Sequence, residues 1–151
     1  ENKSTVQSKL QEVLRSANVT VNEEVQEKLS AFNLLLPNID HLKATMIIHC
    51  AKEENLSVVI EDKDGIEKKA WIQIGENERV FGNSNSNIES SIIEDHQIAF
   101  VLEFNLSNLM IKDLQAGMTL YAGIDHPKYN IRTKEILKKT TTSLAKDFSS
   151  I

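Results

Sequence analysis

The stretch IAFVLEFNL, residues 98–106, decides the fold class of this chain. Its apolar side chains occupy every second position, which is the period of a β-strand with one buried face. A similar alternation returns over residues 118–124. The connections between the predicted strands are too short for crossover helices, so the sheet should be mostly antiparallel. The alternating positions are Ile98, Phe100, Leu102, Phe104 and Leu106, and then Met118, Leu120, Ala122 and Ile124.

Upstream of this strand, residues 56–62 and 66–74 have the pattern of a β-hairpin. A two-residue turn would place Lys69 and Gln73 on the apolar face, whereas a three-residue loop over 63–65 keeps that face apolar. The apolar pattern therefore selects the three-residue loop, in which Gly65 supplies the residue with positive φ. The predicted partners are Val58 with Ala70 and Leu56 with Ile72.

Residues 44–51 are compatible with a helix or with a strand. The cluster Met46-Ile47-Ile48 favours the strand, which would place Ile47 opposite Ile60 and His49 opposite Val58. Ile47 would then join the main apolar face. Residues 82–87, GNSNSN, predict a polar loop, and residues 88–95 predict a short helix or an edge strand.

Helical spacing of apolar residues marks both ends of the chain. One predicted helix begins near Ser4, and a second follows Asn22 and ends at Pro37, so the two form a helical hairpin. A third covers about residues 131–148. We therefore predict a single α+β domain over residues 1–151, with a mostly antiparallel five- or six-stranded sheet, an N-terminal helical hairpin and a C-terminal helix. Because the first residue is Glu1, a fragment of a longer chain is also consistent.

Composition predicts a soluble, acidic protein that does not bind nucleic acid. The formal net charge is −5, and 40% of the residues are hydrophobic. Arginine occurs at only three positions, whereas nucleic-acid readers usually carry a basic footprint. No apolar run is long enough for a membrane span. The single Cys50 excludes an internal disulfide and favours the cytoplasm, although a secreted or anchored domain stays open without an initiator Met.

Three of the four histidines directly follow an aspartate. Histidines with carboxylate support can hold zinc, so His41, His96 and His126 are candidate metal ligands if the fold brings them together. Their wide spacing matches no compact metal motif. The alternative is that each aspartate starts a turn or caps an element and that the histidine beside it is exposed, in which case there is no cofactor.

A second candidate site is an interaction surface. In the predicted register Trp71 points away from the main apolar face, near Met46 and Val59, where either a helix or a partner covers it. Charge is also segregated, because residues 1–125 carry −9 and residues 126–151 carry +4. Lys134 and Lys138 therefore belong to a basic region that could contact the acidic body of the chain or an acidic partner.

Catalytic signatures are missing from the sequence, which has no phosphate-binding loop, nucleophile elbow or HExxH motif. We therefore expect no enzyme but a protein–protein interaction module of the adaptor, chaperone-like, immunity or regulatory kind, with another protein or a second copy as partner. One alternative is a metal-dependent hydrolase that uses the Asp-His pairs. Another is a structural domain of a secreted or membrane-anchored assembly.

Overall fold

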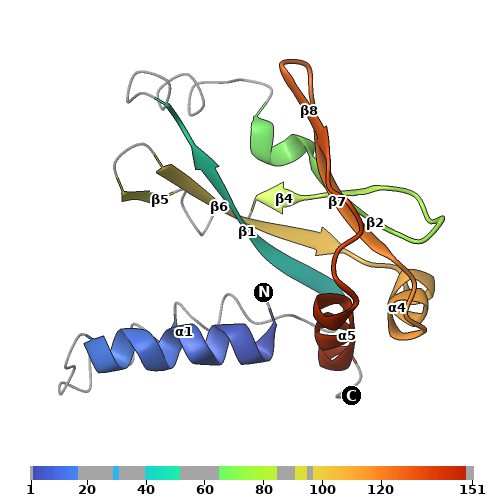
Figure 1. Ribbon diagram of the computed structural model, residues 1–151, viewed down its shortest axis with the longest axis horizontal. Coiled ribbons are helices and arrows are strands. Elements are labelled where there is room, and N and C mark those ends of the chain that lie inside the picture. The colour runs from blue at the N-terminus through green and yellow to red at the C-terminus, as the bar shows by residue number, and fades with distance from the viewer. Residues whose placement is uncertain are drawn as a thin grey trace.

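The computed structural model describes residues 2–16, 29–30, 40–51, 65–84, 91–94 and 97–148. These residues form two antiparallel sheets with helices beside them, so the α+β class is confirmed (Figure 1). The prediction of one five- or six-stranded sheet is wrong. The apolar alternation identifies strands correctly but does not determine which strands pair, and the long strands pair with partners far away in the chain.

The first sheet is built around β6 (Gln97–Asn105), the strand that the alternating sequence predicts. Along one edge β6 pairs with β1 (His41–His49) over its whole length, from His41 opposite Asn105 to His49 opposite Gln97. The other edge is shared by β4 (Asn83–Ser84) and β5 (Ser91–Glu94). The predicted strand over 44–51 is thus confirmed, and residues 91–94 adopt the edge-strand alternative.

The second sheet has the strand order β3-β2-β7-β8. Its strands are β3 (Val80–Phe81), β2 (Ala70–Ile74), β7 (Leu120–His126) and β8 (Tyr129–Arg132). Neighbouring strands are antiparallel throughout. The predicted strand near 118–124 is therefore present, shifted towards its C-terminal end.

The second strand of the predicted hairpin, residues 66–74, contains β2, which pairs with β3 and β7. Ile72 already lies opposite Val80 on one edge of β2 and opposite Ala122 on the other. Both edges of β2 at Ile72 are therefore taken by described strands. Gly65 does have the predicted positive φ, 54°. It precedes the 3₁₀ helix η1 (Ile66–Lys69), however, and not a strand. Residues 56–62 lie outside the described residues.

The side chains of β1 alternate opposite to the prediction. Ala44, Met46 and Ile48 pack against the core, whereas Ile47 is 48% exposed. Pairing with β6 sets this register, because it places Met46 opposite the buried Phe100. The predicted neighbours of Ile47 and His49, at 60 and 58, lie outside the described residues.

The core lies between the two sheets and two helices. The alternating face of β6 supplies Ile98, Phe100, Leu102 and Phe104, as predicted. The remaining buried residues of the cluster come from β1, β2, β7, the segment after β6 and the helices, namely Leu42, Ala70, Ile72, Ile74, Leu106, Leu114, Leu120, Leu144, Ala145 and Phe148.

Three helices accompany the sheets in the described part of the chain: α1 (Lys3–Ser16), α4 (Asn108–Gln115) and α5 (Lys138–Asp147). The predicted C-terminal helix over 131–148 is too long, because its first residues continue β8 after the turn from β7. The second helix of the predicted hairpin falls mostly outside the described residues. Of it only residues 29–30 are described, both helical, and α1 is the N-terminal helix that the described residues show as a whole.

The N-terminal end of α1 is attached to α5 (Figure 1). The side-chain amide of Asn2 donates to Oγ of Ser143 at 2.9 Å, and the amide of Lys3 donates to Oδ2 of Asp147 at 2.9 Å. Residues from the two ends of the chain therefore share one hydrogen-bonded contact. None of the helices in the described segments is both long and apolar enough to cross a membrane.

Candidate functional site

Trp71 lies on the outer face of the second sheet, on the side opposite the core. Its neighbours Ala70 and Ile72 belong to the core cluster, whereas Trp71 does not, although it is only 2% exposed. The predicted orientation away from the core is thus confirmed. Of the two predicted alternatives, the one that leaves Trp71 for a partner to cover is wrong, because the chain itself covers the indole. The guanidinium carbon of Arg79 lies 4.0 Å from the ring centroid.

The indole of Trp71 packs against Gly123 of β7. The two residues lie opposite each other in the strand pair β2–β7. A Cβ atom at residue 123 would lie 2.4 Å from the indole ring and 2.5 Å from the carbonyl oxygen of Ile131. A side chain at this position would therefore displace the tryptophan or the neighbouring strand.

A second arginine is stacked on the same sheet face. The guanidinium carbon of Arg132 lies 4.4 Å from the ring centroid of Tyr121, whose hydroxyl donates to Oε1 of Glu135 at 3.1 Å. Register places both stacks together, since Arg132 is opposite Gly123 and Gly123 is opposite Trp71. We call the residues of this surface the arginine–aromatic face, which consists of Arg79, Trp71, Phe81, Tyr121 and Arg132.

The arginine–aromatic face is a cationic surface with apolar area between the charges. Both arginines are exposed, and Phe81, opposite Trp71, is 44% exposed. Within the described residues, neither guanidinium takes part in an ion pair. Stacking holds a guanidinium flat on an aromatic ring and leaves its N–H edge directed to solvent, where it can donate two parallel hydrogen bonds to a carboxylate or phosphate.

A basic segment continues from this face towards α5. Between Pro127 and Thr140 every residue is exposed except Ile136. The predicted residues Lys134 and Lys138 both lie here. Large apolar side chains are interspersed with the cations, and Tyr129, Ile131 and Leu137 are 53%, 47% and 76% exposed. The other predicted members of the interaction surface lie elsewhere: Met46 packs against the core from β1, and Val59 is outside the described residues.

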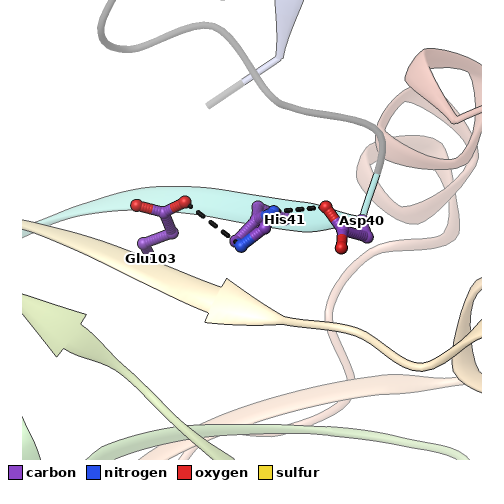
Figure 2. A network of polar contacts seen from close by, with 3 residues as sticks. All are labelled: Asp40, His41 and Glu103. Atoms are coloured by element: carbon purple, nitrogen blue, oxygen red, sulfur yellow. Dashed lines mark ion pairs between the residues drawn. The ribbon is translucent and has the colours of Figure 1, made fainter.

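A separate polar cluster joins the start of β1 to β6 (Figure 2). His41 lies between two carboxylates, with Nδ1 facing Asp40 and Nε2 3.5 Å from Oε1 of Glu103. Its neighbour Lys43 lies directly opposite Glu103 and is 7% exposed. When protonated, the imidazolium is attracted by both acids, so the cluster fastens the end of β1 to β6.

The predicted metal site on His41, His96 and His126 has no support in the described residues, among which no group of three His, Cys, Asp or Glu could hold a metal ion. Both ring nitrogens of His41 face carboxylates, those of Asp40 and Glu103. His126 is 5% exposed at the end of β7, and its Nδ1 accepts a hydrogen bond from the amide of Lys128 at 3.2 Å. His96 lies outside the described residues.

Sequence reasoning missed the two arginine stacks. Arg79 follows the predicted strand over 66–74, but Arg132 lies inside the predicted helix over 131–148, so the sequence pattern did not point to the second stack. Stacking needs a tertiary contact in each case. Arg79 reaches Trp71 across the turn from β2 to β3, and Arg132 reaches Tyr121 through the pairing of β7 with β8.

The fold and the site define a two-sheet α+β protein that presents a cationic, aromatic face. The chain belongs to the family described as "protein of unknown function (DUF3501)", whose model matches residues 1–148. It is similar to a crystal structure of a novel protein of unknown function from Burkholderia pseudomallei, with a TM-score of 0.80 and 27% identity over 97% of this chain and 76% of that chain. Among curated proteins, nothing matches.

Proposed function

We propose that this protein is a non-catalytic protein–protein interaction module and that it binds an acidic partner through the arginine–aromatic face and the adjoining basic segment. The observation that carries the proposal is the pair of exposed guanidinium groups stacked on Trp71 and Tyr121. Two of the chain's three arginines are thus placed on one sheet face.

Charge distribution supports an acidic partner. Residues 127–140 carry five cations and a single anion, in a chain whose net charge is −5. Such a local patch attracts acidic surfaces and speeds their encounter. Arginines already held on aromatic rings lose little side-chain entropy when they bind a carboxylate, which favours tight pairing.

Exposed apolar side chains also support the proposal. Charge pairs at a protein surface contribute only about 0.2–1 kcal/mol each, so a stable complex also needs buried apolar surface. Phe81 provides it beside the arginines, at 44% exposure, and Tyr129 and Ile131 provide it on the other face of β8, at 53% and 47%. Aromatic and arginine side chains are also the residue types enriched at the centre of protein interfaces.

Photo-crosslinking in the cells that express the protein tests this proposal. A photo-reactive phenylalanine analogue at Phe81 should give a discrete protein adduct, and mass spectrometry should locate the crosslink in an acidic segment. The same analogue at Lys112, which is exposed on α4, is the matched control and should not give this adduct.

Arginine dependence makes the test specific. The double variant Arg79→Ala, Arg132→Ala should lose most of the adduct. The single variant Arg132→Lys should retain only part of the adduct, because lysine keeps the charge but not the planar fork. Equal adducts from positions 81 and 112, or an adduct that does not change in the double variant, would refute the proposed surface.

A further inference from the structure

We propose that the acidic partner binds as an extended strand added to the open edge of β8, and that this strand alternates acidic and apolar residues. The inference rests on the proposed function and specifies how that surface is used. Strand addition is a common mode of peptide recognition, in which main-chain hydrogen bonds supply affinity and alternate side chains supply specificity.

Backbone register shows which groups of β8 are available. β8 is the terminal strand of its sheet in the described part of the chain. The amide of Thr133 donates to the carbonyl of Ala122 at 2.8 Å, so residues 122 and 133 form a hydrogen-bonded pair. Hydrogen-bonded pairs occur at every second position of an antiparallel ladder. Tyr129 and Ile131 therefore bond to β7, and the N–H and C=O groups of Asn130 and Arg132 point to the open edge.

Side chains next to this edge explain the alternation. Arg132 lies on the outer face, beside Gly123, and it belongs to the arginine–aromatic face. Tyr129 and Ile131 lie on the other face of β8, both about half exposed, at 53% and 47%. A strand added beside β8 would place every second residue near Arg132 and the intervening residues near Tyr129 and Ile131. Acidic residues fit the first set and apolar residues fit the second.

A second copy of this chain fits the edge less well. Antiparallel pairing of β8 with itself would bring Lys128, Arg132 and Lys134 of one copy close to the same cations of the other copy. Like charges directly opposite each other are destabilising in a sheet. Charge therefore favours an acidic strand from a different molecule.

The experiment titrates the 151-residue chain with a fluorescent peptide in which glutamate and valine alternate over about eight residues, which is within the length of an ordinary strand. Asn130→Pro removes an edge-facing N–H and keeps every backbone hydrogen bond to β7, since proline is tolerated at such edge positions. Asn130→Ala is the matched control. Both variants lose the side-chain hydrogen bond from Asn130 to Asp125, which measures 3.0 Å, but only the proline variant loses the backbone donor.

Strand addition predicts similar affinity for the natural chain and Asn130→Ala, and affinity at least about tenfold weaker for Asn130→Pro. A peptide with N-methyl groups on alternate residues provides the same test without changing the protein, because one of its two registers cannot donate to the edge. A lysine–valine peptide should not bind. Arg132→Ala should weaken glutamate–valine binding about tenfold and reduce its salt dependence.

Other outcomes overturn the inference. Equal affinity for Asn130→Pro and Asn130→Ala, together with unimpaired binding of both N-methyl registers, would show that the peptide does not use the edge. No binding of the glutamate–valine peptide, or a dimer lost in Asn130→Pro, would reject the acidic strand. The crosslink from Phe81 separates this from the proposed function: an adduct that persists in Asn130→Pro refutes strand addition alone, whereas no adduct in the natural chain refutes the interaction surface itself.

Discussion

At the scale of single residues, Gly123 and Trp71 depend on each other. The indole occupies the space that a side chain at 123 would take, and this contact buries a large aromatic ring on the face of the sheet that is not part of the core. Trp71 is also the only tryptophan, so its fluorescence reports this one location.

Gly123→Ala should destabilise the protein by about 1–3 kcal/mol, because a methyl group must displace the indole or the backbone of β8. Chemical denaturation measures the loss, and the emission of Trp71 should shift to longer wavelength. Gly117→Ala is the control: nothing lies within 4 Å of its Cβ position, and its φ of 85° imposes only a backbone penalty. The control should cost about 1 kcal/mol without changing the emission. Unchanged emission in Gly123→Ala would contradict the packing described above.

Arg79 forms the other side of the same contact. Removing it in Arg79→Ala should cost about 0.5–1 kcal/mol, the usual size of an exposed cation–π interaction. Acrylamide should then quench Trp71 more strongly, because the guanidinium 4.0 Å from its ring centroid is gone. Arg132→Ala is the matched control, since that arginine covers Tyr121 instead. Equal quenching of Trp71 in both variants would show that Arg79 does not shield the indole.

At the scale of elements, α4 is a helix that the sequence analysis did not predict, although a capping residue and a glycine mark its two ends. Ser107 caps its start, and its Oγ accepts a hydrogen bond from the amide of Met110 at 3.3 Å. Gly117, with positive φ, follows its end. Leu114 faces the core, with Met110 and Ile111 half-buried beside it. The preceding alternation of β6 obscures this short signal.

Ser107→Ala should destabilise the protein by about 1 kcal/mol, because the cap satisfies one of the free amides at the start of α4. Ser107→Asn retains an oxygen that can accept the same hydrogen bond and should recover most of the loss. Thermal unfolding of the three proteins is the measurement. If the asparagine variant were as unstable as the alanine variant, the cap would not be the source of the effect.

At the scale of the whole molecule, α5 connects the core to the other end of the chain. Leu144, Ala145 and Phe148 are buried in the cluster between the two sheets. The same helix accepts hydrogen bonds from Asn2 and Lys3, at Ser143 and Asp147. Loss of α5 packing should therefore affect the sheets and α1 together.

Phe148→Ala should cost about 3–5 kcal/mol, the usual range for removing a buried phenylalanine. Hydrogen exchange should also accelerate in the first turn of α1, because its contact with α5 loosens. Leu137→Ala is the control, since that leucine is 76% exposed, and it should change stability by less than about 0.5 kcal/mol. Protection of α1 that is unaffected by Phe148→Ala would mean that the two helices are held independently.

The sequence by itself determined the local structure wherever the pattern was long and regular. The alternation of residues 98–106 predicts β6 and its buried face, and the positive φ of Gly65 follows from turn chemistry. These features depend on residues close in the chain, so periodicity and backbone sterics are enough to specify them. The segregated charge likewise locates the basic segment, with Lys134 and Lys138 in it.

Only the tertiary structure decided which strands pair and where the arginines stack. Several strands carry similar apolar alternation, so a local hairpin and a distant partner satisfy the pattern equally well, and a shift of one residue reverses a face. Ile47 and Trp71 show the consequence: the first is exposed and the second is buried under Arg79 and against Gly123. Both outcomes depend on tertiary contacts, with β6 for Ile47 and with Arg79 and Gly123 for Trp71, which propensity and spacing do not encode.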